Sequence, residues 1–278
     1  MKVVNTVAEL HAALANCPKE AIGFVPTMGA LHAGHRSLVE RARRENQMVV
    51  VSVFVNPTQF NDKNDLRNYP RTPEADCKVL EAVGADIVFM PSVEDIYPEP
   101  DTRVFDFGLV DKVMEGATRP GHFNGVAQVV SRLFDLVRPK RAYFGEKDFQ
   151  QIAVIKAMVE QLAIDIEIVE CTIVRGEDGL ALSSRNELLT PEHRKAAPHI
   201  YATISKSAEL MATMSPAELT AWVTATIDSN PLLKTIYFEV VDARTMQRVE
   251  SWQESERIQG CCAVQAGDIR LIDNIRIK

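Results

Sequence analysis

The first candidate site contains two histidines, His32 and His35, separated by two residues of which one is Gly34. They follow a short apolar stretch, residues 21–26, and lie at the start of a stretch with helical spacing, residues 34–46. A helix start offers unpaired N–H donors and the positive end of the helix dipole. Two imidazoles can also donate hydrogen bonds to phosphate oxygens that gain negative charge. The pattern predicts a phosphate-binding site, and the alternative is a helix cap or a surface pair without a ligand.

Zinc ligation is another interpretation of the same pair. Zinc sites need further Cys or His ligands at defined spacing. The remaining histidines are scattered along the chain, at His11, His122, His193 and His199. The sequence therefore favours phosphate over zinc, and we predict no metal-ligating set.

Two side-chain amides form the second candidate site. Asn56 and Gln59 follow a Val-rich stretch, residues 48–55, and Phe60 comes directly after them. Amides both donate and accept hydrogen bonds, which suits a small polar ligand with hydroxyl and carboxylate groups. The phenyl ring of Phe60 would supply an apolar wall. The alternative is an ordinary polar loop that turns at Pro57.

A lysine near a predicted helix start marks the third candidate site. Lys147 and Asp148 follow Gly145 and Glu146 in a strand-to-helix turn. A lysine at a helix N-terminus is electrostatically unfavourable unless an anion lies nearby, so we interpret Lys147 as a phosphate ligand rather than a solvated side chain. Asp148 fits as the helix cap, and Gln151 falls in the first turn.

Two further polar loops complete the set. Residues 180–186 carry two hydroxyls, on Ser183 and Ser184, and the guanidinium of Arg185. Such a combination suits a triphosphate, whereas a Ser-rich linker is the alternative. Residues 119–126, Arg-Pro-Gly-His-Phe-Asn-Gly-Val, are interpreted either as a lid or pocket edge or as a plain loop.

Other common enzyme signatures are absent from the sequence. There is no G-x-x-x-x-G-K-[ST] phosphate loop, and no G-x-G-x-x-G follows a predicted strand. No Ser-centred nucleophile elbow is present either. A dinucleotide enzyme or a serine hydrolase is therefore not supported.

Strand-like and helix-like segments that alternate along the first two thirds of the chain must position these residues. We predict strands over 21–26, 48–55, 86–90 and 164–169, and helices over 34–46, 73–83, 125–137 and 148–161. Such alternation predicts right-handed βαβ units and a Rossmann-like, doubly wound parallel sheet. In this fold class ligands bind at the carboxyl ends of the strands, where the candidate residues lie.

The pattern changes after about residue 176. Thr190-Pro191 and Ser215-Pro216 precede predicted helices in the favoured order, with a cap residue before a proline. Segments 235–241, 261–265 and 269–277 have the composition of strands. We therefore predict an α/β domain over 1–176 and a smaller α+β domain over 177–278, with a hinge near the glycines of 176–179.

Composition limits the partners. The chain has 278 residues with 31 Lys+Arg and 38 Asp+Glu, a net charge of −7, which argues against polymeric nucleic acid. The longest apolar run is too short for a membrane span, and the start of the chain has no signal-like segment. The odd number of cysteines, without C-x-x-C spacing, predicts free thiols in a reducing compartment: Cys17, Cys77, Cys171, Cys261 and Cys262. We predict a cytoplasmic protein.

Taken in order, six motifs resemble the pantoate–β-alanine ligase (pantothenate synthetase) family: PTMGALHAGH, FVNPTQF, YPRT, RPGHFNGV, FGEKDFQQ and LSSRN. The H-x-G-H element is typical of the wider nucleotidylyltransferase superfamily, which includes class I aminoacyl-tRNA synthetases. The resemblance covers residues 25–186 and continues more weakly through 270–274, Arg-Leu-Ile-Asp-Asn. It implies that pantoate attacks the α-phosphorus of ATP to give pantoyl adenylate and pyrophosphate. The amine of β-alanine then releases AMP and forms pantothenate. A homodimer is also implied.

The same resemblance implies roles for single residues. His35, His32, Lys147 and Arg185 are the expected catalytic residues. Pantoate is expected to contact Gln59 and Gln151, with Asn56 beside them. The expected ATP-binding set is Met28, Gly29, Ala30, Leu31, His32, Ala33, Gly34, His35, Gly145, Glu146, Lys147, Asp148, Val174, Leu182, Ser183, Ser184 and Arg185, with Val174 approaching the adenine by its backbone.

Mg²⁺ is expected to accompany ATP. Some relatives place an acidic pair just after YPRT, but here the stretch is Glu74-Ala75-Asp76, so we expect the phosphates and water to hold the metal.

Two other functions remain open from the sequence. One is a different nucleotidyltransferase, which would keep the nucleotide on its product; the pair Gln59 and Gln151 and the Ser183–Arg185 loop favour the ligase. The other is a regulator that senses a nucleotide without turnover, which would not need a full set of charge-neutralising residues. A tRNA synthetase is disfavoured by the net charge of −7, the short chain and the lack of a lysine-rich second signature.

Overall fold

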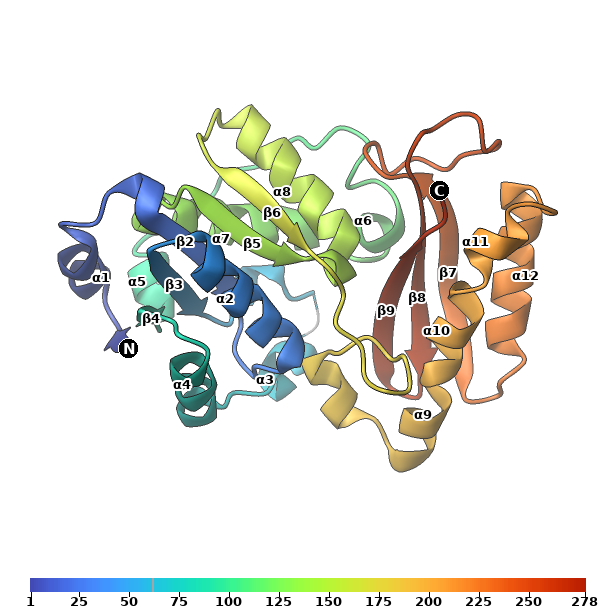
Figure 1. The fold of residues 1–278 in the computed structure, drawn as a ribbon, viewed down its shortest axis with the longest axis horizontal. Coiled ribbons are helices and arrows are strands. Elements are labelled where there is room, and N and C mark those ends of the chain that lie inside the picture. The colour runs from blue at the N-terminus through green and yellow to red at the C-terminus, as the bar shows by residue number, and fades with distance from the viewer. Residues whose placement is uncertain (62) are drawn as a thin grey trace. The chain divides into compact units, whose positions relative to one another are not determined.

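A computed structural model describes residues 1–61 and 63–278 of the chain (Figure 1). The chain forms two compact units. Unit 1 comprises residues 1–107, 119–146 and 154–172, and unit 2 comprises residues 108–118, 147–153 and 173–278. Unit 2 thus includes two segments that precede residue 173 in the chain.

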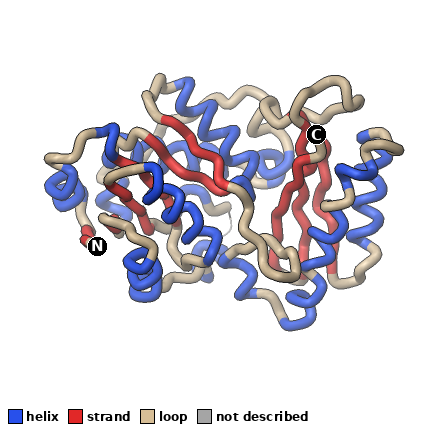
Figure 2. The backbone as a smooth tube through the Cα atoms, in the orientation of Figure 1, coloured by secondary structure: helices blue, strands red, loops and turns tan. Residues whose placement is uncertain are grey.

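Unit 1 is built on a six-stranded sheet in the order β1-β4-β3-β2-β5-β6. Every pairing is parallel, as predicted. Figure 2 shows the strands in red. Their bounds are β1 Lys2–Val4, β2 Ile22–Thr27, β3 Met48–Val53, β4 Ile87–Phe89, β5 Arg141–Gly145 and β6 Glu167–Cys171. The chain progresses in one direction from β2 to β4 and in the other from β5 to β6. The switch point between β2 and β5 is where such sheets bind ligands.

Both faces of this sheet are covered, which explains the continuous apolar strands. Val25 of β2 packs with Leu38 and Val39 of α2, whereas the neighbouring Phe24 meets Phe134 of α7 edge-on at 6.3 Å. Successive strand residues therefore face opposite helical layers. The helices with residues in unit 1 are α1 Val7–Leu14, α2 Ala33–Glu45, α3 Lys63–Asn68, α4 Pro73–Ala82, α5 Val93–Ile96, α7 His122–Val137 and α8 Phe149–Gln161, of which α8 begins in unit 2.

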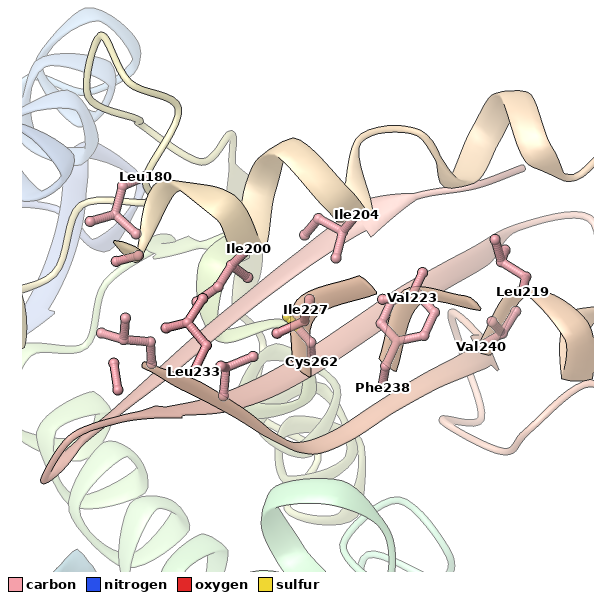
Figure 3. Packing of buried hydrophobic residues seen from close by; sticks show 14 of the residues in the cluster. Leu180, Ile200, Ile204, Leu219, Val223, Ile227, Leu233, Phe238, Val240 and Cys262 are labelled. Atoms are coloured by element: carbon pink, nitrogen blue, oxygen red, sulfur yellow. The ribbon is translucent and has the colours of Figure 1, made fainter. Parts of the chain in front are cut away.

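Unit 2 contains an antiparallel sheet in the order β7-β8-β9, with β7 Leu233–Asp242, β8 Ile258–Ala266 and β9 Ile269–Arg276. Side chains of Val240 and Cys262 face a core that includes Ile204 and Leu219 (Figure 3). The helices of this region are α9 Pro191–Ala196, α10 Pro198–Ile204, α11 Ser207–Leu210 and α12 Pro216–Asp228.

The opposite face of the same sheet explains why residues 108–118 and 147–153 belong to unit 2. Val241 and Cys261 alternate with the residues that face the helices, and they pack against Met114 and Phe149. Met114 opens α6 (Met114–Thr118), and Phe149 opens α8. Residues 108–118 and 147–153 therefore cover apolar surface that a three-stranded sheet would otherwise expose.

Most predicted elements are confirmed, with small shifts in their bounds. The predicted caps at Thr190 and Ser215 both form, and Ser215 makes a full capping box with Glu218. Helix α7 begins three residues earlier than expected, at His122, because Gly121 turns the chain with φ +80°. Strand β6 begins later than predicted, because residues up to Ile164 still close the end of α8 by hydrogen bonds.

The structure also contains elements that were not predicted. Strand β1 and helix α1 open the chain, where no element was predicted. Asp148 ends a short 3₁₀ turn (Glu146–Asp148) directly before α8.

Within the described part of the chain, no helix combines the length and apolar character needed to cross a bilayer.

Candidate functional site

The two histidines lie at the start of α2, with His32 as the N-cap residue and His35 in the first turn, and they cap the helix together. Gly34 N–H donates to Nδ1 of His32 at 3.1 Å, and His32 N–H donates to Nδ1 of His35 at 3.3 Å. The ring centroids are 4.1 Å apart. This is a capping box built from two imidazoles in place of the usual hydroxyl and carboxylate.

The cap determines the tautomer of each neutral ring. Because Nδ1 accepts a hydrogen bond in both His32 and His35, the proton of the neutral imidazole is on Nε2. Each ring therefore carries one N–H donor at the start of α2, where the helix dipole also favours an anion. The cap alternative and the phosphate site are thus compatible. Gly34 is required because a Cβ there would lie 2.8 Å from Cε1 of His32.

Asp76 supports the same loop. Its side chain is almost fully buried, with 2% of the residue exposed. Oδ2 accepts from Ala30 N–H at 3.1 Å and Oδ1 from Leu31 N–H at 2.8 Å, and Thr72 Oγ1 also donates to Oδ1. The loop needs such support because Gly29 and Ala30 both have positive φ, +83° and +50°. The sequence marked Asp76 only as half of an interrupted acidic pair, and its contact with this loop was not predicted.

The amide residues after β3 form a second loop that meets the first. Asn56 is 1% exposed. Its Oδ1 accepts from Tyr97 Oη and Thr58, while its Nδ2 donates to Gly125 O and to Gln59 Oε1. Gln59 Nε2 lies 3.2 Å from Sδ of Met28. The structure therefore brings Met28 and Gln59 together, and Asn56 braces their loop.

The segment of residues 119–126 packs directly on this amide loop. A ring nitrogen of His122, Nδ1, lies 2.9 Å from Gln59 O. A Cβ at Gly125 would lie 2.5 Å from Thr58 O, so only glycine permits the approach. Arg119 Nη1 lies 3.1 Å from Nε2 of His122. Residues 119–125 are therefore a wall of the Gln59 loop.

The C-terminal end of α2 is anchored to β5. Tyr143 Oη donates to Glu45 at 2.9 Å and accepts from Asn46 Nδ2 at 2.6 Å. Burial raises the pKa of the Tyr143 phenol, and the nearby Glu45 carboxylate raises this pKa further. The phenol therefore stays protonated. The helix that carries the histidines at its start is thus held at its other end.

In unit 2, Lys147 lies in the 3₁₀ turn before α8, and its carbonyl accepts from Nδ2 of Asn274 at 3.0 Å. Gln151 is in the first turn of α8, as predicted. Its neighbour Gln150 is buried and binds the 108–118 segment through Val110 O, Val113 O and Glu115 N–H.

The Ser-Ser-Arg loop belongs to the same unit. Leu182 N–H donates to Val174 O, so the chain folds back on itself around the turn at 176–179. Ser183 caps the 3₁₀ helix Ser184–Leu188 by accepting from Arg185 N–H at 3.3 Å. A pocket within unit 2 is lined by Lys147, Ser183 and Asn186 together with Ala181 and Asp273. The structure thus places two of the predicted phosphate ligands at one pocket.

Comparison with known proteins shows which family the chain resembles. A family model described as pantoate-beta-alanine ligase matches residues 2–276. The pantothenate synthetase of Bacteroides fragilis (strain YCH46) is 57% identical over 280 residues, with 100% of this chain and 99% of the relative covered. That of Porphyromonas gingivalis (strain ATCC 33277) is 56% identical with full coverage of both chains.

Solved structures show the same similarity. The pantothenate synthetase of Thermus thermophilus superposes with a TM-score of 0.94 at 48% identity, covering 100% of this chain and 99% of that one. A pantoate-beta-alanine ligase of Francisella tularensis, complexed with beta-gamma ATP and beta-alanine, has a TM-score of 0.84 at 36% identity, with 100% and 98% covered. The family resemblance and the fold class inferred from the sequence are confirmed. The chain belongs to the pantoate–β-alanine ligase family.

Proposed function

We propose that this chain condenses (R)-pantoate with β-alanine, using ATP, to give pantothenate, AMP and pyrophosphate. The observation that carries the proposal is the two-histidine cap of α2 in a chain that matches the ligase family over residues 2–276. His32 and His35 each use Nδ1 for the cap and carry a proton on Nε2, which suits them to an anionic ligand at the helix start.

In the first half-reaction a carboxylate oxygen of pantoate attacks the α-phosphorus of ATP. A new O–P bond forms, the bond to the bridging oxygen of the β-phosphate breaks, and pyrophosphate leaves with that electron pair. His32, His35, Lys147 and Arg185 are the groups we assign to offset the charge that develops on the phosphoryl oxygens. The intermediate is pantoyl adenylate.

The proposed ATP-binding set keeps the residues singled out in the sequence. Support for it comes from the pocket that Lys147 and Ser183 share in unit 2, and from the cap geometry in unit 1. The full set is Met28, Gly29, Ala30, Leu31, His32, Ala33, Gly34, His35, Gly145, Glu146, Lys147, Asp148, Val174, Leu182, Ser183, Ser184 and Arg185.

We assign pantoate recognition to Gln59 and Gln151. Their amides can donate to the carboxylate and accept from the hydroxyls of pantoate. The contact of Gln59 with Met28 supports this role, because it links the amide loop to the proposed nucleotide loop. Asn56 is buried with both ends of its amide bonded to protein, so its contribution is to hold Gln59 in place.

In the second half-reaction the uncharged amine of β-alanine attacks the acyl carbon of the adenylate. The new C–N bond displaces AMP, and the amine loses a proton. Water must be excluded, because it would hydrolyse the same mixed anhydride. We propose that residues 1–176 form the domain that binds ATP and pantoate, and that residues 177–278 form the smaller domain that closes during the reaction.

Magnesium is proposed to enter with ATP as part of the substrate. The described residues contain no cluster of three or more His, Cys, Asp or Glu side chains arranged to bind a metal ion. Both oxygens of Asp76, the acidic residue after YPRT, already accept hydrogen bonds from the histidine loop. The phosphates and water would therefore supply the ligands of the ion. We further propose a cytoplasmic homodimer, and sedimentation of the purified chain would test its oligomeric state.

Isotope exchange separates this function from its competitors. Labelled pyrophosphate should exchange into ATP when pantoate is present, without any need for β-alanine. Net AMP should accumulate with pantoate and β-alanine together, and ADP should not. Exchange that does not depend on pantoate would indicate a different nucleotidyltransferase. ATP binding without any exchange would indicate a nucleotide sensor.

A further inference from the structure

The segment Arg270–Asn274 of β9 has no role in the reaction scheme above, although it belongs to the resemblance detected in the sequence. Two consecutive residues of this segment, Asp273 and Asn274, are buried, with 5% and 3% exposed. Buried polar side chains are stable only where their hydrogen bonds are made. The partners of these two residues include two separate loops of unit 2.

Asn274 reaches the lysine loop. Its Nδ2 donates to the backbone carbonyl of Lys147 at 3.0 Å, and its Oδ1 accepts from Nε2 of Gln259 at 2.7 Å. The orientation of the amide is therefore determined from both ends. A hydrogen bond to a main-chain carbonyl limits the position of the residue that carries it, here Lys147.

Asp273 reaches the other loop through Arg175. The two side chains form a bidentate pair at 2.6 and 2.9 Å. Arg175 also donates to Gly179 O at 3.2 Å, and its guanidinium carbon lies 3.7 Å from the ring centroid of Tyr201. The arginine thereby fixes the turn at 176–179, which leads directly into Ala181–Arg185.

A pocket connects these two loops. Lys147, Ala181, Ser183 and Asn186 line it, and so does Asp273. An unpaired carboxylate in such a pocket would repel phosphate. The bidentate bond to Arg175 compensates the charge of Asp273 and leaves Lys147 as a cation for an anionic ligand.

We propose that Asp273 and Asn274 are positioning residues of the ATP site. Asn274 sets the place of Lys147 through its carbonyl, and Asp273 sets the Ser183–Arg185 loop through Arg175. Neither residue is assigned a contact with the reacting atoms. The proposal rests on the function proposed above for Lys147 and for the Ser183–Arg185 loop.

A double-mutant cycle on ATP affinity tests the first half of this proposal. Calorimetric titration of ATP into the folded full chain gives the dissociation constants of wild type, Asn274→Ala, Lys147→Ala and the double variant. Loss of the bond should weaken ATP binding about tenfold in the wild-type background. In the Lys147→Ala background the same change should cost less than about twofold, because residues that act through each other are not additive.

The matched control is Gln265→Ala. Gln265 of β8 also makes an amide-to-carbonyl bond, to Gly267 O at 2.8 Å in the turn between β8 and β9. The Gln265→Ala variant should bind ATP with the affinity of wild type. Thermal melts should show that all variants are folded. Equal losses from Asn274→Ala in both backgrounds would overturn the proposal, since a general structural defect is additive. If Lys147→Ala itself binds ATP and releases pyrophosphate like wild type, the proposed role of Lys147 fails instead.

Asp273→Asn tests the second half of the proposal. A positioning role of Asp273 and the simple effect of its negative charge predict opposite changes in ATP affinity. The substitution removes a negative charge beside a phosphate pocket, which by charge alone would tighten ATP binding. If Asp273 positions Arg175, the variant should instead weaken binding about tenfold. Arg175→Lys, which keeps the charge but loses the bidentate geometry, should show the same loss. Tighter binding in Asp273→Asn, or wild-type binding in Arg175→Lys, would overturn this half.

Discussion

The most informative single change is Asp76→Asn. It removes one hydrogen-bond acceptor that supports the histidine loop, while the side chain at position 76 keeps nearly the same shape. The carboxylate of Asp76 accepts from Ala30 N–H at 3.1 Å and from Leu31 N–H at 2.8 Å. An asparagine has one acceptor oxygen, and its NH₂ group would face the other donor. One of the two loop N–H groups therefore loses its partner.

The magnitude follows from these two bonds. A hydrogen bond to a charged group contributes about 2 kcal/mol, and a change of that size is about 30-fold in an equilibrium constant. The loop also contains Ala30 at φ +50°, which does not hold that conformation without support. We expect the loop of the variant to open about 30-fold more often than that of wild type.

Amide hydrogen exchange measures this opening directly. The amides of Ala30 and Leu31 should exchange about 30-fold faster in Asp76→Asn, while amides in β3 keep their rates. Pyrophosphate release should also fall, because displacement of His32 and His35 by about 1 Å is enough to slow phosphoryl transfer about 100-fold. The control is Glu74→Gln, because Glu74 is exposed and lies, like Asp76, in the first turn of α4.

Two results would refute the reasoning. If exchange at Ala30 and Leu31 is unchanged in Asp76→Asn, the carboxylate does not hold the loop. If the variant instead needs much more Mg²⁺ for the same rate of pyrophosphate release, Asp76 is a metal ligand rather than a support.

Further predictions concern the site and its anchors. His35→Ala and Lys147→Ala should each lose pyrophosphate release by roughly 100-fold or more while the circular dichroism spectrum stays that of wild type; retention of the wild-type rate would remove the assigned role. Gly34→Ala should weaken ATP binding in a titration, because its Cβ would lie 2.8 Å from Cε1 of His32. Tyr143→Phe should lower the free energy of unfolding in urea by about 1–2 kcal/mol, since it removes one buried and one partly buried hydrogen bond; an unchanged value would mean that these bonds do not anchor α2. Chelation by EDTA should stop pyrophosphate release, and added Mg²⁺ should restore it fully.

Local order in the sequence was sufficient for much of the fold. The alternation of strand and helix patterns predicted a parallel sheet. The candidate-site motifs of the sequence fell at the carboxyl ends of the predicted strands. Helix caps such as Ser215 were predicted because a cap residue lies directly before the proline that begins its helix. The histidine pair was also recognised locally, although the sequence alone left a cap and a phosphate site as competing interpretations.

Contacts between distant residues were decided only by the tertiary structure. Asp76 lies 46 residues from Ala30, and Asn274 lies 127 residues from Lys147. Sequence periodicity depends on neighbours within a few positions, so it predicts which face of an element is buried but not which distant element covers it. The same limit explains why residues 108–118 were not expected beside β7–β9, where they cover an apolar face. The candidate catalytic residues were therefore predicted from the sequence, and the residues that hold them in place were revealed by the packing.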